Sequence, residues 1–526
     1  MSLLWAGPAR ADDAAALTAA QTLYRTGMLA NGQPVQGERE GGAGVQGASA
    51  ACVNCHRRSG LGSAEGRIVF PPIIGKYLFR PLYKNAQDLN MPHVASFTGH
   101  RQPYTDDTLK RAIRDGVGPS GEPLNYLMPR YKLDDAALQG MVDYLKQLTS
   151  LPTPGVSDTT LQFATIITPD ADPRTRDAMV AVMQKFFAVK NALIGGAGRP
   201  MQTARPVMYR VERRWELHVW QLTGSADTWE QQLDAHLAAE PVFAVLSGLG
   251  GKNWAPVHRF CERREVPCLF PNVELPVHDA SDFYSVYFSR GVLLEAQLMA
   301  DRIGAAAPSH VLQIYRTADI GEAAAKALQT QLGAAVHVTD QAVPADAPAS
   351  AVAAALREAQ AGSTVVLWLR PADVAALPAQ PPPGVQVLMS GRMGGLEHAP
   401  LPAAWRAATV MAYPFDLPDL RRFRMNFPLT WFRLQQLPVV DEQVQSDTYL
   451  ACGILAEALS EMLDSFVRDY LVERLEDMLS HRQLTGYYPR LGLGPTQRFA
   501  SKGGYFVKFA AQTGDKVEPV GEWVVP

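Results

Sequence analysis

The chain lacks three features that would place it at once in a broad class of protein. It has no charge excess, since 49 basic side chains face 52 acidic ones and the formal net charge is −3. Nucleic acid and anionic membranes therefore lose their main electrostatic attraction, and we expect neither as a partner. No apolar run reaches the length of about 18 residues that spans a bilayer, so we expect no membrane-spanning segment. Cysteine is scarce, with five in 526 residues and a single C-x-x-C pair.

What the chain does have is length, because 526 residues exceed a single ordinary core and predict two or three domains. Ala9-Arg10-Ala11 before Asp12 has the A-x-A form of a signal-peptidase site, although the apolar stretch before it is short. We interpret residues 1–11 as the remnant of a secretory signal or as an expression leader. The mature chain is therefore expected in the periplasm of a Gram-negative type of cell.

A break in composition divides the remainder. Residues 151–160, "LPTPGVSDTT", combine prolines with a glycine and small polar residues, which suits an extended linker. Before it, residues 12–150 show helical spacing near 14–28, 105–116 and 134–148, with long glycine- and proline-rich loops between. After it, residues 161–526 alternate strand-like runs with amphipathic helices. That alternation predicts parallel sheets with helices on both faces, in two lobes.

The C-x-x-C pair is followed directly by histidine in "CVNCH", so Cys52, Cys55 and His56 admit three interpretations. A zinc site requires four ligands, and no second C-x-x-C or H-x-x-x-H pair exists to complete one. A thioredoxin-type dithiol belongs at a strand-to-helix junction of a βαβ unit, whereas this motif lies in a helical, glycine-rich context. Covalent attachment of one haem c requires only the two thiols and the adjacent histidine, and we favour it.

A haem iron bound by His56 would take a second axial ligand on its other face. Met128, followed by the stiffening Pro129 in "LMPRY", is the candidate, because a thioether is a soft, neutral ligand that favours ferrous iron. Its rivals are Met91, His93 and His100. The order of the expected helices favours Met128, and filling both axial positions favours electron transfer over catalysis at the haem.

With these motifs in place, residues 12–150 resemble a class I cytochrome c. The resemblance rests on an N-terminal helix, then "CVNCH", "YTDDTLKRAIRDGVGPSG", "LMPRY" and a last helix ending in "MVDYLKQL". It implies a small all-α domain in which the first and last helices cross, with Tyr24 meeting Tyr144 or Leu145. It also implies thioether bonds to the two cysteines and a periplasmic redox partner.

Residues 161–526 resemble a type I periplasmic ligand-binding protein of the branched-chain amino-acid ABC-transporter group. The resemblance rests on strand order and on "AEPVFAVLSGLGGKNWAPVHRFCERREVPCLFPNVE" and "SDTYLACGILAEAL". It implies two α/β lobes that close on a small molecule, with loops at the carboxyl ends of strands lining the cleft. The candidate ligand-binding residues, all in such loops, are Ser247, Gly248, Asn272, Glu274, Asp319 and Arg392.

Two of these residues bear on the kind of ligand. Asn272 and Glu274 stand where that group offers small hydroxyl residues, so a standard aliphatic amino acid is not the expected ligand. The amides of residues 248–251 suit an anion if they open a helix, and the alternative is a tight glycine turn.

The remaining cysteines fit an oxidising compartment. Cys261 and Cys268 flank a helix end and the next strand, and we expect a disulfide between them. Cys452, within an apolar helical run, is expected to be a buried small side chain.

Two functional hypotheses follow. The first is a periplasmic haem c electron carrier fused to a small-molecule-binding domain, either accessory to a periplasmic dehydrogenase system or gated by its ligand. The alternative is a pure electron-transfer protein whose second domain is a docking scaffold with a degenerate cleft. We do not expect an enzyme, because no nucleophile–base or metal-ligand constellation is visible after residue 160.

Overall fold

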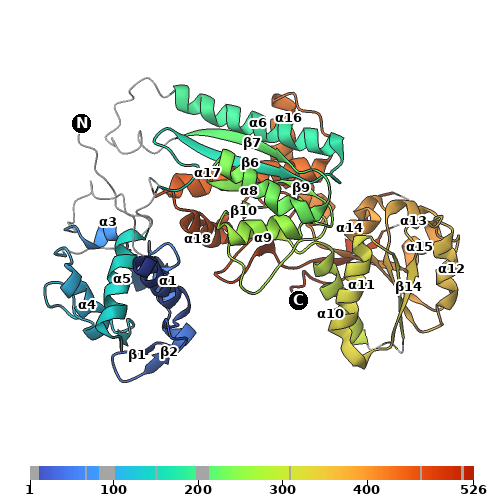
Figure 1. Ribbon diagram of the computed structural model, residues 1–526. Coiled ribbons are helices and arrows are strands. Elements are labelled where there is room, and N and C mark those ends of the chain that lie inside the picture. The colour runs from blue at the N-terminus through green and yellow to red at the C-terminus, as the bar shows by residue number, and fades with distance from the viewer. Residues whose placement is uncertain are drawn as a thin grey trace. The chain divides into compact units, whose positions relative to one another are not determined.

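The computed structural model describes residues 11–65, 68–81, 101–148, 152–196, 213–306, 308, 310–462, 465–510 and 514–526. They form two compact units (Figure 1). The first contains the described residues of 1–156 and also 458–474, which include most of α18 (Arg468–Met478). The second contains the described residues of 157–204, 212–457 and 475–526. The linker and domain limits drawn from the sequence stay predictions, and Met91, His93 and His100 lie outside the described residues.

Two crossing helices organise the first unit. α1 (Ala11–Thr26) lies against α5 (Asp135–Gln147), and the ring centroids of Tyr24 and Tyr144 are 5.4 Å apart. Residue 105 caps α4 (Asp106–Asp115), because the Thr105 side chain accepts a hydrogen bond from the backbone N–H of Thr108. The three expected helices and the Tyr24–Tyr144 contact are confirmed. Two short helices, α2 (Val53–His56) and α3 (Gly75–Leu78), complete the helical part.

The first unit is not purely α-helical, which corrects the expected all-α domain. Short antiparallel strands form a three-stranded sheet and a two-stranded ladder. They are β1 (Gln36–Glu38), β2 (Gly44–Gln46), β5 (Arg130–Tyr131), β3 (Ser63–Glu65) and β4 (Ile68–Phe70). Strands of two or three residues are too short to carry an alternating pattern, so they could not be predicted from the sequence.

The first sheet of the second unit is entirely parallel. Its strands follow the order β11-β9-β6-β8-β10-β12-β18, and β7 pairs with β6. The strands are β6 (Thr160–Ile167), β7 (Arg214–Gln221), β8 (Ala244–Leu246), β9 (Leu249–Gly250), β10 (Cys268–Leu269), β11 (Asn272–Val273), β12 (Ser285–Ser289) and β18 (Phe499–Ser501). The helices that flank it are α6 (Pro173–Gly196), α8 (Trp229–Ala239), α9 (Ala255–Arg263) and α17 (Glu442–Glu461).

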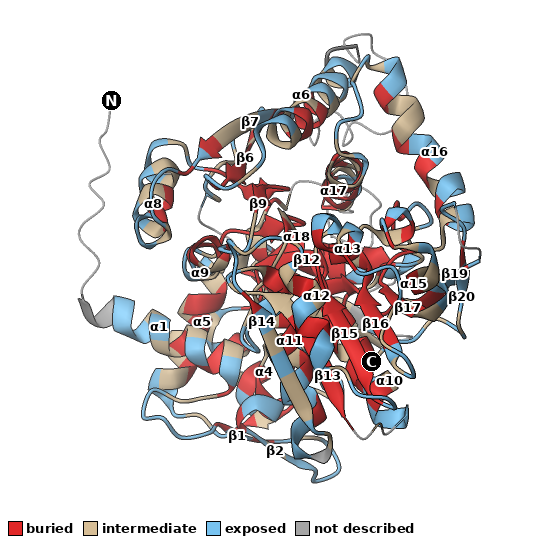
Figure 2. Ribbon diagram, turned by 90° about the vertical axis from the view of Figure 1, so that its right-hand side faces the viewer, coloured by how far each residue is buried: buried red, intermediate tan, exposed pale blue. Residues whose placement is uncertain are grey.

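The second sheet is mixed. Its order is β14-β13-β15-β16-β17-β19-β20, in which the last two strands run antiparallel to their neighbours. The strands are β13 (Val311–Arg316), β14 (Val338–Val343), β15 (Thr364–Trp368), β16 (Gln386–Ser390), β17 (Thr409–Tyr413), β19 (Tyr505–Phe509) and β20 (Val517–Pro519). Figure 2 shows its central strands as buried, as expected of a sheet covered on both faces. The helices beside it are α10 (Val292–Ala306), α11 (Ile320–Leu332), α12 (Ala351–Ala355), α13 (Pro371–Ala375), α14 (Gly391–Gly394) and α15 (Ala403–Ala408). α16 (Pro418–Leu434) instead packs on α6 and α17, where the ring centroid of Trp431 lies 6.1 Å from that of Phe186 and 5.0 Å from that of Tyr449.

The expected disulfide between Cys261 and Cys268 is not formed in the structure. Both side chains belong to one buried apolar cluster, to which α9 contributes Cys261 and β10 contributes Cys268. Each sulfur therefore packs as a small apolar group in the core. Cys452 is fully buried in α17, in agreement with the sequence. In the described part of the chain, no helix is long and apolar enough to cross a membrane.

Candidate haem site and ligand cleft

A largely apolar cavity of about 410 Å³ lies in the first unit, and all four predicted haem contacts line it. Cys52, Cys55 and His56 come from the start and body of α2, while Met128 comes from the turn before β5. Most of the remaining wall is aliphatic or aromatic. It includes Leu23, Tyr24, Leu78, Tyr104, Leu109, Ile113, Tyr131, Met141 and Leu145. Such a wall suits the apolar face of a porphyrin.

The His56 ring is oriented for iron ligation. Its Nδ1 lies 2.9 Å from the carbonyl oxygen of Pro71, and because a carbonyl can only accept, Nδ1 carries the proton and donates it. Nε2 is therefore left as the lone-pair nitrogen, the arrangement found in metal-bound histidines. Burial lowers the pKa of His56, which favours the neutral ring that can bind a metal.

The thiol electrostatics bear on the dithiol interpretation of the motif. Burial raises the pKa of Cys52 to about 12, and burial likewise raises the pKa of Cys55. Dithiol exchange uses a thiolate, and a site built for it lowers the pKa of the attacking cysteine. Thioether formation consumes the thiols and needs no stable thiolate in the folded protein. The site therefore fits haem attachment best.

The backbone around Met128 is held on both sides. Its N–H donates to the carbonyl of Asn125 at 3.0 Å, and its own carbonyl accepts from the guanidinium of Arg130 at 2.5 Å. Two hydrogen bonds thus hold the segment that presents the thioether to the cavity. The Tyr131 hydroxyl then donates to the carbonyl of Ala50 at 2.8 Å, which joins this segment to the chain just before Cys52.

Two arginines on the cavity wall were not singled out in the sequence. Arg101 donates to the carbonyls of Tyr77 and Leu78 at 2.6 and 3.1 Å. The Nε of Arg39 is buried and has no hydrogen-bond partner among the described residues. A buried, unsatisfied guanidinium N–H at the wall of an apolar cavity suits an anionic group of the ligand, such as a haem propionate. The residues present thus fit haem in both their apolar and polar parts.

In the second unit, the structure brings together three of the predicted ligand-binding residues. The Asn272 side-chain amide donates to Ser247 Oγ at 2.9 Å, and its backbone N–H donates to the carbonyl of Gly248 at 2.9 Å. Ser247 Oγ also lies 3.0 Å from Thr448 Oγ1 of α17, and Ser247 is fully buried. These groups satisfy one another. Thr448 could not be predicted as a partner of Ser247 from the sequence, because the two residues are 201 positions apart.

The amides of residues 248–251 do not lie at the start of a helix, as an anion site there would require. Leu249 and Gly250 instead form β9, which pairs with β6 and β11. The carboxylate of Asp170 lies so close to Gly251 that an added Cβ would be 2.3 Å from it. A negative side chain beside this turn disfavours an anion, so the geometry favours the alternative of a tight glycine turn.

Glu274 and Asp319 meet through a residue that the sequence did not reveal. Arg370, which follows β15, donates to Glu274 Oε1 at 2.7 Å and to Asp319 Oδ1 at 2.7 Å. Both carboxylates line a cavity of about 300 Å³ with Asp170 and Lys252. Burial raises the pKa of Asp319, but the hydrogen bonds and charge of Arg370, the backbone N–H of Ile320 and the charge of Lys252 together bring it below its usual value. Arg370 thus links β11 of the first sheet to the start of α11 beside the second.

Arg392 stands apart from that cavity. Its backbone N–H donates to Glu295 Oε1 at 2.9 Å, and its guanidinium lies 5.5 Å from the ring centroid of Phe415. The wall of the 300 Å³ cavity does not include it. The predicted ligand-binding residues therefore lie in three separate places: Ser247, Gly248 and Asn272 in the first, Glu274 and Asp319 in the second, and Arg392 in the third.

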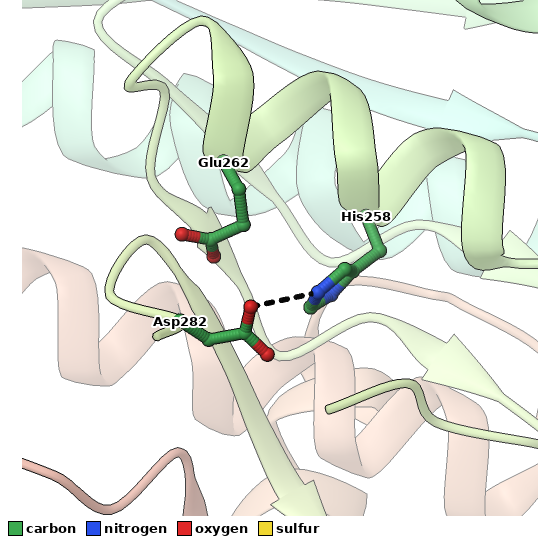
Figure 3. Close-up of side chains that lie close together, drawn as sticks. All are labelled: His258, Glu262 and Asp282. Atoms are coloured by element: carbon green, nitrogen blue, oxygen red, sulfur yellow. Dashed lines mark hydrogen bonds and ion pairs between the residues drawn. The ribbon is translucent and has the colours of Figure 1, made fainter. Parts of the chain in front are cut away.

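His258, Glu262 and Asp282 approach closely enough to hold a metal ion, with ligand atoms within 4.8 Å of one another (Figure 3). Each group already has hydrogen bonds. His258 Nε2 lies 3.1 Å from Asp282 Oδ1, and its Nδ1 lies 3.0 Å from the Tyr287 hydroxyl. Glu262 accepts from the backbone N–H groups of residues 283–285 at 2.7–3.0 Å. This pattern is typical of a network that holds the start of β12.

Comparison with known proteins agrees with both halves of this description. Residues 42–149 match the family model of cytochrome c. No curated protein sequence matches the chain. Its fold is similar to that of a solute-binding protein from Rhodopseudomonas palustris BisB5 in complex with 3,4-dihydroxybenzoic acid. The two share 10% identity at a TM-score of 0.50, over 70% of this chain and 97% of that one.

Two further solved structures are similar. A branched-chain amino-acid ABC transporter protein from Thermus thermophilus with bound valine shares 12% identity at a TM-score of 0.48, over 70% of this chain and 98% of that one. A fatty acid ABC transporter substrate-binding protein from Thermomonospora curvata shares 15% at 0.46, over 71% and 94%. The chain is thus a multidomain protein that combines a cytochrome c region with an α/β fold of the substrate-binding-protein kind.

Proposed function

We propose that the protein carries electrons on one covalently bound haem c and that its α/β region binds a small molecule, in the periplasm. The observation that carries the first part is the apolar cavity whose wall contains Cys52, Cys55, His56 and Met128 together. When bound, the haem supplies an iron centre that exchanges one electron at a time. The proposal involves no catalytic reaction, and a periplasmic redox protein is the partner it requires.

The chain's own residues hold that group and exclude water from it. Cys52 and Cys55 tether it through thioether bonds, His56 presents Nε2, and Met128 presents its sulfur from a hydrogen-bonded turn. A neutral imidazole and a neutral thioether add no charge to the iron, and a methionine ligand raises the reduction potential. With both His56 and Met128 holding the iron, the bound haem would supply electron exchange.

Mass spectrometry of protein matured in a periplasm with haem-attachment machinery tests the cofactor. We expect an added mass equal to one haem that survives denaturation and is lost in the Cys52→Ala/Cys55→Ala double variant. A chain that matures without added mass, beside a control cytochrome that gains it, overturns the haem assignment.

The axial assignment has a matched test. In Met128→Ala, the ferrous protein should bind carbon monoxide readily, because the sixth position is then open. In Met91→Ala, a change at a rival position, carbon monoxide binding should stay as weak as in the parent. The reverse pattern would assign the ligand to Met91 instead.

A second candidate function is favoured by one feature of the cleft. Ser247, Asn272 and Thr448 are hydrogen-bonded to one another, and Arg370 forms ion pairs with both Glu274 and Asp319. Polar side chains that already satisfy one another suit a docking scaffold in a pure electron-transfer protein. Calorimetry with common amino acids and 3,4-dihydroxybenzoate as probes separates the two. Saturable binding that is lost in Glu274→Gln supports the ligand-binding domain, and no heat from any probe supports the scaffold.

A further inference from the structure

A carboxyl group from far along the chain is buried in the first unit. Glu473, in α18, is 3% exposed, and its two oxygens accept hydrogen bonds from Ser59. The backbone N–H of Ser59 lies 2.9 Å from Oε1, and Ser59 Oγ lies 2.5 Å from Oε2. Within the described chain, no basic side chain forms an ion pair with Glu473. Among the described residues, the buried carboxyl of Glu473 therefore has no positively charged side chain in direct contact with it.

Ser59 belongs to the turn that follows the haem-binding motif. It stands three residues after His56, and its Oγ also accepts from the backbone N–H of Leu61 at 3.1 Å. Gly62, which follows Leu61, donates its N–H to the carbonyl of His56 at 3.3 Å. Hydrogen bonds and a few peptide units thus connect the Glu473 carboxyl to the backbone of the axial histidine.

Tyr24 gives a second indication that Glu473 lies near the haem cavity. It lines the haem cavity, and its hydroxyl donates to the carbonyl of Arg57 at 2.7 Å. Burial raises the pKa of Tyr24, and the negative charge of an ionised Glu473 raises it further. Glu473 therefore acts on a phenol that lines the cavity, which places the carboxyl within electrostatic range of the cavity.

Glu473 is poised between its two protonation states. Burial raises its pKa to about 8, the hydrogen bonds from Ser59 lower it, the charge of Asp469 raises it, and Arg57 lowers it. Asp469 in turn lies 3.6 Å from the guanidinium of Arg25. Asp469, Arg57 and Tyr24 are thus titratable or charged groups that act on the carboxyl. Near neutral pH, a change of one charge nearby is enough to shift its protonation.

We propose that Glu473 takes up a proton when the haem site takes up an electron, so that electron transfer by this protein is coupled to proton transfer. The inference rests on the proposed function, since it requires haem bound at His56. One electron comes from the reduced redox partner and lowers the charge of the iron by one. One proton comes from water and binds a carboxylate oxygen of Glu473, which restores the local charge. On oxidation, the electron leaves to the acceptor and the proton returns to water.

The test is the reduction potential of the full haem-loaded chain, measured by spectroelectrochemistry from about pH 6 to pH 9, on either side of the carboxyl pKa. In the parent protein the potential should fall as pH rises, with a slope approaching one proton per electron. In Glu473→Gln, which has the same shape but cannot ionise, that slope should be lost, leaving only what haem propionates contribute. Asp107→Asn removes one exposed carboxylate of the same unit and should keep the parent slope.

Two further measurements test proton uptake by Glu473 independently of the potential of Glu473→Gln. Infrared difference spectra should show a protonated carboxyl band that appears on reduction and is absent in Glu473→Gln. In Ser59→Ala, loss of a hydrogen bond that lowers the pKa should move the sloping range to higher pH. A parent slope in Glu473→Gln, or an unchanged or lower range in Ser59→Ala, overturns the proposal. Protein without haem would instead refute the proposed function, whereas a reversible couple with no pH dependence would refute only this inference.

Discussion

Replacing Glu295 by glutamine should remove a large pH dependence of stability from the second unit. Glu295 lies in α10 with no exposed surface, and it accepts hydrogen bonds from Ser390 Oγ and from the backbone N–H of Arg392. Burial raises its pKa from 4.5 to about 7, more than these hydrogen bonds and the charge of Arg392 lower it. The folded protein therefore holds this proton at a pH where the unfolded chain has released it.

The sign of the effect follows from the raised pKa. The stabilisation from holding the proton is fully present below pH 4.5 and is lost as pH rises through about 7. Since one pKa unit corresponds to about 1.4 kcal/mol, deprotonation makes the fold about 3 kcal/mol less stable on the alkaline side. Glu295→Gln does not ionise, so its stability relative to the parent should rise by about 2–3 kcal/mol between pH 5 and pH 8.5.

Urea denaturation followed by tryptophan fluorescence measures this difference, because Trp368 and Trp405 are fully buried in the same part of the fold. Glu358→Gln, which changes an exposed carboxylate after α12, is the control and should follow the parent at both pH values. If the gap between Glu295→Gln and the parent is the same at pH 5 and pH 8.5, burial does not control the titration of Glu295 and the reasoning is refuted.

Three other outcomes follow from particular contacts. Gly60→Ala should destabilise the first unit by about 2–4 kcal/mol, because Gly60 has φ +69° and an added Cβ would lie 2.6 Å from Leu148 Cδ2. A melting curve by far-UV circular dichroism that is unchanged from the parent would contradict this. Arg370→Met should speed amide hydrogen exchange in residues 316–319, because Arg370 donates hydrogen bonds to the Asp319 carboxylate. Arg357→Met, a change at an exposed arginine, should leave that exchange unchanged. Equal exchange rates in the two variants would show that Arg370 does not hold this loop. A thiol reductant should leave the melting temperature of the second unit unchanged, since Cys261 and Cys268 are not joined, and a marked fall would restore the disulfide.

Much of the fold could be predicted because its signals are local. Thr105 and Asp134 cap their helices through side-chain hydrogen bonds to the next turn, so the helix starts could be located from a few consecutive residues. The alternation of strands and helices expected in residues 161–526 is confirmed, because buried parallel strands need continuous apolar residues. The short strands of the first unit and the antiparallel β19 and β20 were missed, since their pairing depends on segments far away in the chain.

By itself, the sequence determined the C-x-x-C-H motif in residues 52–56, the helix order on which the choice of Met128 rests, and the alternation that predicts the α/β region. These depend on neighbours in the chain and on a fixed period. Only the tertiary structure decided which side chains satisfy one another. It pairs Ser59 with Glu473 and Ser247 with Thr448, and it places Arg370 between two carboxylates. The physical reason is that a hydrogen bond or ion pair depends on distance in space, and partners hundreds of residues apart leave no pattern in the sequence.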